Sequence, residues 1–493
     1  MNKLKALAGQ TAIYGLSSII GRFLNYLLVP LYTYNLPADQ YGIVTELYTY
    51  VGFLIILLTY GMETGFFRFA NQEKDYREVY TTSLLSLLGT SSLFILIIVL
   101  FNSNIAELIG YGNTPQYILW FGIIIGADAL TTIPFAKLRH ENKAGRFAVI
   151  KLLNILINVG FNLFFIVYCP YLKQHSPNAW LITQFHLGDI SVKYIFISNL
   201  IASLATLILL IPDIFTLKLK FNPVIWRKII IYSLPLLLAG LAGMVNEMLD
   251  RILLKIYLPD GVNVMREIGI YGANYKIAIL MTLFIQMFRY AADPFFFSQS
   301  KEKDAKKTYA DVMKYFIIFG LLIFLGVMLY LDIIKYFIGA DYREGLRIVP
   351  IILLANLFLG IIYNLSIWYK LTNRTRFGAM IAVFGAVITI VLNIILIPKI
   401  GYMGSAWATF FCYFSMMLLS LYLGSRYYKI NYPYRSVLLY FALALSLYFA
   451  STKISISTTW IHLSVNTVLI GIFIIFVLLK EHIIFNPKKH LSS

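Results

Sequence analysis

The chain has 493 residues, of which 59% are hydrophobic and 13% are charged, with a formal net charge of +18. Soluble domains have about 45–50% apolar and about 25% charged residues, so this composition excludes an ordinary water-soluble fold. The apolar residues occur in runs of roughly twenty, the length that a helix needs to cross the hydrocarbon of a bilayer. The sequence therefore predicts an all-α, polytopic membrane protein.

We expect about fourteen transmembrane helices, so both termini face the same side. The first is an uncleaved helix, because no small-residue cleavage site follows its apolar run. The expected spans cover residues 11–33, 41–61, 80–101, 116–135, 147–168, 192–212, 229–249, 269–289, 310–331, 345–366, 377–398, 403–424, 434–451 and 459–479.

Lysine and arginine accumulate in one set of connections and are scarce in the alternate set. Connections 34–40 and 102–115 contain neither residue, and 169–191 contains only Lys173. Because cytoplasmic loops retain basic residues, both termini are predicted to be cytoplasmic. Basic residues dispersed over many short loops are typical of loops that set the membrane orientation and attract anionic lipids. We therefore expect no nucleic-acid partner.

Two segments share an ordered motif: a basic residue before leucine, an Arg-Phe pair, and an asparagine inside the next span. The near-constant offset indicates a duplicated six-helix unit, and an even-numbered unit repeats with the same orientation. We therefore expect an N-lobe at 1–213, a C-lobe at 214–430, and two extra C-terminal helices with a cytoplasmic tail at 431–493. The matched positions are Lys137, Arg146 and Asn162, and Lys370, Arg376 and Asn393.

Polar side chains inside spans are costly, so they commonly face a cavity or a partner. Arg22 lies near the middle of the first span, with Asn25 one turn further on. The fifth span has polar residues at i, i+3, i+7 and i+11, which share one helical stripe. The residues of this stripe are Lys151, Asn154, Asn158 and Asn162.

We interpret these positions as the lining of a chamber for an anion, because arginine presents a planar fork that suits phosphate. The asparagines suit the hydroxyls of a sugar. Glu46 and Asp128 are the carboxylates that we expect to serve in any ion coupling. The predicted cationic residues are Arg22, Lys151, Lys276, Arg251 and Arg289, and the predicted polar lining is Asn25, Asn154, Asn158, Asn246 and Asn274.

Structural roles are the alternative for several of these residues. Asn162 and Asn393 are suited to hydrogen bonds between helices. Arg251, like Lys255 and Arg289, lies near a span end and can snorkel to the interface. Glu247 and Arg251 are also spaced to pair on one helix face.

No metal or cofactor site is expected. Cys169 and Cys412 lie far apart, and the six histidines lack the spacing of a helical metal site. The sequence contains no phosphate-binding loop and no evident pair of catalytic carboxylates, so it predicts a transporter without catalytic residues.

Five segments, in this order, resemble the Wzx-type polysaccharide flippases of the multidrug/oligosaccharidyl-lipid/polysaccharide exporter superfamily. They are GRFLNYLLVPLYTYNLPADQYGIV, GMETGFFRFAN, PFAKLRHENKAGRF, MLDRILLKIYLPDG and YGANYKIAIL, within residues 8–430. The resemblance implies two lobes around a cationic cavity that opens alternately to each side. It also implies an undecaprenyl-diphosphate-linked oligosaccharide as substrate, moved to the outer leaflet of the inner membrane for surface polysaccharide (O-antigen or capsule) biosynthesis.

The same resemblance assigns Arg22 to the cavity and places Arg68, Arg139 and Lys143 at its cytoplasmic mouth. It implies a polysaccharide polymerase or a chain-length protein as partner. The related lipid II flippases usually have several arginines in their first two spans, whereas this chain has Arg22 alone at depth. A lipid II flippase, a multidrug exporter of the same fold and a membrane glycan polymerase or ligase are the alternatives.

Overall fold

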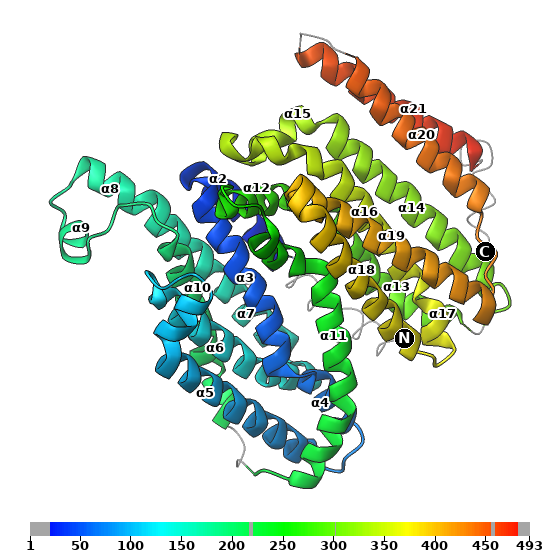
Figure 1. Cartoon of the computed structure of the whole chain (residues 1–493). Helices are drawn as coiled ribbons and strands as arrows, with labels where there is room; N and C mark the ends of the chain where they lie inside the picture. Colours follow the sequence, from blue (N-terminus) through cyan, green and yellow to red (C-terminus); the bar gives the residue numbers. More distant parts are fainter. Residues whose placement is uncertain (1–19, 216–219, 301, 455–458, 482–493) are drawn as a thin grey trace. The chain divides into compact units, whose positions relative to one another are not determined.

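The computed structural model describes residues 20–215, 220–300, 302–454 and 459–481. Within these ranges every regular element is a helix (Figure 1). In the described part of the chain, twelve helices are long and apolar enough to cross a membrane, or up to thirteen if α12 (Val264–Ile277) and α13 (Ile279–Gln299), bent by 50°, form one span. The predicted all-helical polytopic fold is confirmed, and the first expected span, 11–33, lies partly outside the described residues.

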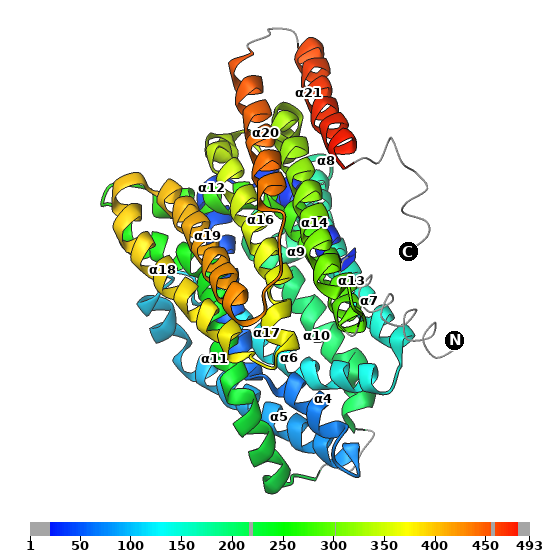
Figure 2. The ribbon, with the colours of Figure 1, turned by 90° about the vertical axis from the view of Figure 1, so that its right-hand side faces the viewer.

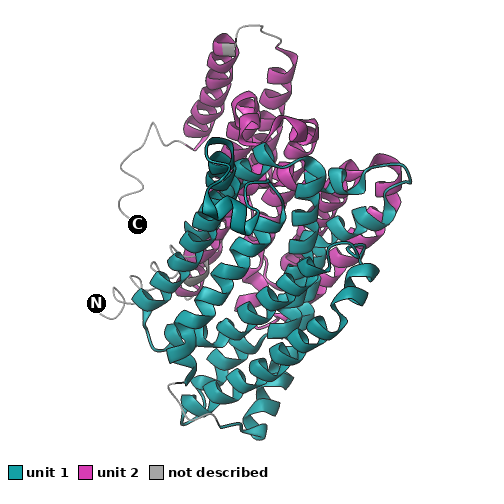
Figure 3. Ribbon diagram, turned by 90° about the vertical axis from the view of Figure 1, so that its left-hand side faces the viewer, with its two compact units in different colours: residues 1–269 teal, residues 270–493 magenta. Residues whose placement is uncertain are grey.

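The chain divides into two compact units, residues 1–269 and 270–493 (Figure 3). The lobe boundaries expected after residues 213 and 430 remain a prediction. In the first unit, before the start of α12, the elements are α2 (Leu28–Asn35), α3 (Ala38–Thr59), α4 (Met62–Ala70), α5 (Tyr76–Leu108), α6 (Pro115–His140), α7 (Ala144–Leu163), the π-helix η1 (Phe164–Tyr168), α8 (Cys169–His175), α9 (Trp180–Phe185), α10 (Lys193–Phe215) and α11 (Pro223–Tyr257).

The second unit contains the rest of α12, all of α13 and the last two spans, which pack on α14 (Figure 2). Its further elements are α14 (Ala305–Leu329), α15 (Leu331–Ile334), η2 (Lys335–Phe337), η3 (Ala340–Ile348), α16 (Val349–Leu365), α17 (Ile367–Leu371), α18 (Arg376–Ile400), α19 (Tyr402–Tyr427), α20 (Tyr434–Lys453) and α21 (Thr459–Lys480).

Polar caps and prolines start several of the spans. Asp75 precedes α5 and accepts a hydrogen bond from the backbone N–H of Arg77. Asn222 precedes α11, and its Oδ1 accepts from two backbone N–H groups of the first turn, while Pro223 occupies the first helical position. These side chains satisfy backbone donors that have no partner inside the helix, which fixes where each helix begins.

The helix that contains η1 is longer than the hydrocarbon layer. Residues Ala144–His175 form one continuous helical run of 32 residues through α7, η1 and α8. At 1.5 Å per residue this run is about 48 Å long, against about 30 Å of hydrocarbon. The run is therefore about 18 Å longer than the hydrocarbon is thick.

Two glycines of the first unit let the backbones of α3 and α12 meet. A Cβ atom on Gly42 would overlap the carbonyl oxygen of Met265, and one on Gly269 would overlap that of Ala38. Small residues at such crossings allow van der Waals packing that larger residues prevent, which is a main source of association between membrane helices.

We predict that Gly42→Ala destabilises the protein by about 1–3 kcal/mol, because the added methyl group forces two backbones apart. Gly89 in α5 is the matched control, since a Cβ there meets nothing within 4 Å. Gly89→Ala should be neutral or stabilising by up to about 1 kcal/mol. Thermal unfolding of both purified variants in one detergent measures the difference, and equal midpoints would contradict the role of the crossing.

Two polar clusters attach α20 and α21 to α14. At one end Glu481 forms an ion pair with Lys314 of α14 and accepts a hydrogen bond from Tyr440 of α20. At the other end Asn466 of α21 donates 2.6 Å to the carbonyl of Leu329. Burial alone would raise the pKa of Glu481, but the hydrogen bonds from Lys314 and Tyr440 hold that pKa below its ordinary value.

This pKa shift predicts a pH dependence of stability. A carboxyl whose pKa is lower in the folded than in the unfolded protein stabilises fully above the unfolded pKa, and the stabilisation is lost as pH falls through the folded pKa. The ordinary value for Glu481 is 4.5, so the loss begins below that pH. Glu481→Gln should lower the unfolding temperature at pH 7. It should also make the unfolding temperature fall less steeply as the pH drops below 4.5. Glu302→Gln, at an exposed position, should change neither property.

Candidate functional site

The polar stripe predicted for the fifth span lies on α7 and contacts neighbouring helices of the first unit. On one side Asn154 Nδ2 donates to the carbonyl of Ala202, at 3.0 Å, and to Thr206 Oγ1, at 2.9 Å, both in α10. On the other side Asn158 Nδ2 donates 3.3 Å to Asn25 Oδ1 in the helical segment before α2. These amides therefore hold α7 between two other helices.

Asn162 continues the stripe one turn further, just before η1. The hydroxyl of Tyr32 donates 2.9 Å to Asn162 Oδ1, and Asn162 Nδ2 donates to the carbonyl oxygen of Asn158, at 2.8 Å, and to Asn158 Oδ1, at 3.1 Å. Asn162 is 0% exposed and Tyr32 is 8% exposed. Asn162 thus has the interhelical role that the sequence offered as an alternative to cavity lining.

Arg22 differs from the stripe because it is exposed. The preceding residue, Gly21, is buried against Ile155 of α7, where a Cβ would approach Ile155 Cδ1 to 2.7 Å. Gly21 therefore allows close packing, and Asn25, one turn later, reaches Asn158. Among the residues that the structure describes, Arg22 has no ion pair or hydrogen bond.

Two other predicted cations of the first unit have acidic partners. Lys151 is half-buried, its Nζ lies 4.2 Å from the centre of the Phe135 ring, and it interacts electrostatically with Asp128. Arg251 is buried, and its Nη1 lies 2.8 Å from Asp250 Oδ1. Arg251 is therefore compensated by a carboxylate within the unit, while Lys151 interacts with Asp128 at longer range.

The spacing of Glu247 and Arg251 does not produce a carboxylate pair. Arg251 Nη1 instead donates 2.7 Å to the backbone carbonyl of Glu247. The Glu247 side chain is exposed and forms no hydrogen bond or ion pair with any residue described here. Arg251 instead pairs with Asp250, its immediate neighbour in the chain, and both side chains are buried.

The predicted residues of the second unit have mixed surroundings. Arg289 of α13 is exposed, with its guanidinium 3.9 Å from the centre of the Tyr363 ring of α16. Lys276 is also exposed. Asn274 is fully buried, and its amide donates to the carbonyls of Ile270 and Tyr342, at 2.8 and 2.7 Å, so it ties α12 to η3.

The two acidic candidates differ in burial. Glu46 of α3 is 0% exposed and accepts hydrogen bonds from Lys255 Nζ, at 2.7 Å, Tyr111 OH, at 2.6 Å, and Tyr50 OH, at 3.0 Å. Lys255, for which snorkelling was an alternative, thus points at a buried carboxylate. Asp128 is half-buried beside Lys151. A role of Glu46 or Asp128 in ion coupling remains a prediction, as does the lining role of the buried Asn246.

The three residues predicted at the cytoplasmic mouth all have partners in the first unit. Arg68 lies 4.2 Å from the centre of the Tyr232 ring. Arg139 pairs with Glu63 at 2.5 Å. Their role at a mouth remains a prediction.

Lys143, the third of these residues, pairs with Glu141 at 2.6 Å. The pair lies outside the spans, and it shifts the pKa values of both residues. The hydrogen bond and charge of Glu141 raise the pKa of Lys143. Burial opposes the charged form of Glu141, but hydrogen bonds from Lys143 and Tyr76 keep its pKa below the ordinary value.

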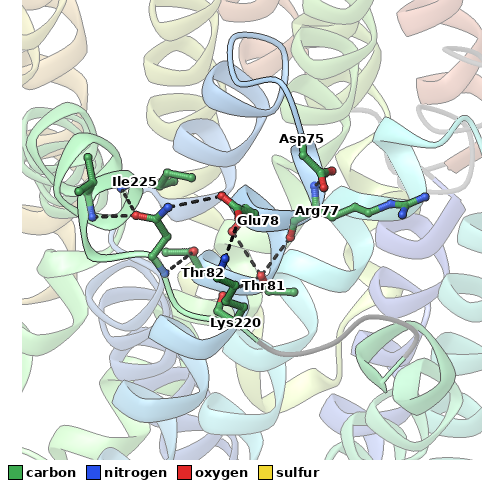
Figure 4. A network of polar contacts seen from close by, with 9 residues as sticks. Asp75, Arg77, Glu78, Thr81, Thr82, Lys220 and Ile225 are labelled. Atoms are coloured by element: carbon green, nitrogen blue, oxygen red, sulfur yellow. Dashed lines mark hydrogen bonds and ion pairs between the residues drawn. The ribbon is translucent and has the colours of Figure 1, made fainter.

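A polar network that the sequence does not predict joins the start of α5 to the start of α11 (Figure 4). Glu78 accepts hydrogen bonds from Lys220 Nζ, at 3.2 Å, and Asn222 Nδ2, at 3.4 Å. Thr81 Oγ1 donates to the carbonyl of Lys220, and Thr82 Oγ1 accepts from the backbone of Asn222. The sequence pattern that could have indicated this network is a pair of consecutive threonines one turn after a glutamate. Their partners follow only from the fold.

No family model matches the sequence, and no curated protein matches it. Among solved structures, one described as the lipid II flippase MurJ in an inward closed conformation aligns with a TM-score of 0.72 and 17% identity, covering 94% of this chain and 98% of that one. An inward-facing multidrug resistance MATE transporter of the MOP superfamily has a TM-score of 0.63 and 12% identity, covering 83% and 96%. The chain has the fold of the MOP-superfamily transporters.

A third MOP-superfamily transporter, from Pyrococcus furiosus, is described by the reverse polarity of its binding pocket. It aligns with a TM-score of 0.57 and 12% identity, covering 85% of this chain and 95% of that one. At such identities the likeness shows the fold alone. These MOP-superfamily neighbours are transporters and flippases rather than enzymes, and the chain is a multi-pass membrane protein like them.

We predict that Glu46→Gln destabilises the protein by about 3 kcal/mol, because it leaves the Lys255 ammonium without a counter-charge in a largely buried site. The double variant Glu46→Gln with Lys255→Met should recover most of that loss, since no unpaired charge remains. Unfolding temperatures of wild type, both single variants and the double variant form the cycle. A double variant that is as unstable as the sum of the singles would contradict the interpretation of a closed ion pair.

Proposed function

We propose that the protein is a flippase that moves an undecaprenyl-diphosphate-linked oligosaccharide from the cytoplasmic to the outer leaflet of the inner membrane, for surface polysaccharide biosynthesis. The observation that supports the proposal is Arg22, an exposed cation in the first expected span, with no partner among the described residues. It lies near the middle of the first expected span, 11–33.

A lone arginine at this depth is costly unless water or a ligand meets it. Its planar fork matches phosphate oxygens with two parallel hydrogen bonds. Asn25, one turn further along the helix and held by Asn158, adds an amide group that suits the acceptors of a phosphate joined to a glycan. The likeness to a lipid II flippase over nearly the whole chain supports a lipid-borne substrate.

The compensation of the other charges supports an anionic substrate. Glu46 is paired with Lys255, Asp250 with Arg251, and Asp128 lies beside Lys151. Of the predicted cations of the first unit, Arg22 is the one that is exposed and has no partner among the described residues. In this proposal two lobes, 1–213 and 214–430, alternate access to the substrate while both termini remain in the cytoplasm, and the product passes to a polysaccharide polymerase or chain-length partner.

A multidrug exporter of the same fold is the second candidate, and Glu247 is the observation that favours it. Its exposed carboxylate has no partner among the residues described and would suit a cationic amphiphile. Arg22 and Glu247 therefore make opposite predictions about the charge of the substrate.

The test compares Arg22→Gln with Glu247→Gln in a strain whose surface glycan depends on this gene. We expect Arg22→Gln to reduce delivery of lipid-linked glycan to the outer leaflet at least tenfold, because one charge-assisted pair is lost. Glu247→Gln should stay within twofold of wild type. Arg22→Lys, which keeps the charge without the fork, should be intermediate.

Protein levels in the membrane control for folding. Normal glycan delivery by Arg22→Gln at normal levels would contradict the proposal. Loss of drug resistance in Glu247→Gln, with glycan delivery intact, would establish the exporter instead. Accumulation of lipid II on the cytoplasmic side in Arg22→Gln would identify lipid II as the substrate.

A further inference from the structure

Four residues of the first unit form a continuous chain of hydrogen bonds, which we call the amide relay: Tyr32, Asn162, Asn158 and Asn25. The Tyr32 hydroxyl lies 2.9 Å from Asn162 Oδ1, and Asn162 Nδ2 lies 3.1 Å from Asn158 Oδ1. Asn158 Nδ2 lies 3.3 Å from Asn25 Oδ1. The relay therefore connects a buried phenol to an exposed amide.

The direction of the relay is fixed by a backbone group. Asn162 Nδ2 also lies 2.8 Å from the carbonyl oxygen of Asn158, which can only accept. The Asn162 amide must therefore present its nitrogen to Asn158 and its oxygen to Tyr32. It follows that Asn158 accepts through Oδ1 and donates through Nδ2, so that Asn25 accepts through Oδ1.

The exposed end of the relay is a hydrogen-bond donor. With Oδ1 engaged by Asn158, Asn25 has its Nδ2 group left, and this group donates to no residue that the structure describes. Arg22 lies one turn earlier, at i−3, on a neighbouring part of the same helix surface. Hydrogen bonds in a chain polarise one another, so the upstream bonds strengthen the terminal donor.

We infer that Tyr32 and Asn162 are positioning residues, which act through Asn158 to aim the Asn25 amide as a donor beside Arg22, and that this pair binds the phosphate oxygens of the lipid-linked substrate. The inference rests on the proposed function and specifies the subsite for the diphosphate. Phosphate oxygens only accept, so two donors, one charged and one neutral, complement them.

The second unit offers a matched control. Asn393, the counterpart of Asn162 in the predicted repeat, is also 0% exposed; it donates to the carbonyl of Thr389 and accepts a hydrogen bond of 2.9 Å from Ser405 Oγ. Ser405→Ala, like Tyr32→Phe, removes a hydroxyl that donates to a buried asparagine oxygen. The amide relay does not include Ser405 or Asn393, so Ser405→Ala tests the loss of such a hydroxyl outside the relay.

The test uses purified full-length protein and tritiated farnesyl diphosphate, with unlabelled farnesol as competitor. Wild type should bind farnesyl diphosphate, and unlabelled farnesol should displace little of the bound radioactivity. Tyr32→Phe should weaken diphosphate binding by about three- to tenfold, as expected for one hydrogen bond acting on a neighbouring donor. Ser405→Ala should stay within twofold, although its thermal stability falls comparably.

A double-mutant cycle separates positioning from general destabilisation. In the Asn25→Ala background the relay has no terminal donor, so Tyr32→Phe should cause no further loss of affinity. Equal losses from Tyr32→Phe in both backgrounds, or no loss in either, would overturn the relay while leaving the flippase proposal intact. Equal competition by farnesol and by unlabelled diphosphate in wild type would overturn both.

Discussion

The cost of an unsatisfied polar group in hydrocarbon is the constraint on which this structure depends. Water is absent there, so each buried donor, acceptor or charge needs a partner within the protein. Glu46 meets this requirement with three donors, one of them the Lys255 ammonium. Arg251 meets it with Asp250 and a backbone carbonyl. Because these buried charges are compensated, a charge without a described partner, such as Arg22, stands out as a candidate for binding a ligand.

The same constraint explains why the fold was predictable. Backbone groups in lipid are satisfied by helices, and the length of a helical span is set by the bilayer, so apolar runs alone give the spans. The expected span at 377–398 corresponds to α18 at Arg376–Ile400, and that at 434–451 to α20 at Tyr434–Lys453. The bend between α12 and α13 was not predictable, because no proline or glycine marks the break at Ala278.

The sequence predicts which polar residues share a helix face, but not which residues they contact. The periodicity placed Lys151, Asn154, Asn158 and Asn162 on one stripe, and α7 contains it. Which residues are compensated depends on neighbours far away in the chain, such as Lys255 for Glu46 or Thr206 for Asn154. Spacing within one helix suggested a pair of Glu247 with Arg251, but burial selected Asp250. Sequence periodicity gives the face of a helix, and tertiary packing decides what meets it.

The length of the continuous helix α7–η1–α8 has a practical consequence for work on this protein. This helix is about 18 Å longer than the hydrocarbon is thick, with Tyr171 exposed on its α8 end, and it leads into a connection whose Trp180 and Phe185 side chains are exposed. That connection is a natural handle for an epitope or a rigid crystallisation partner. A tag fused there would be carried by a helix anchored through Asn158 and Asn162, so its motion would report directly on the helix that holds the amide relay.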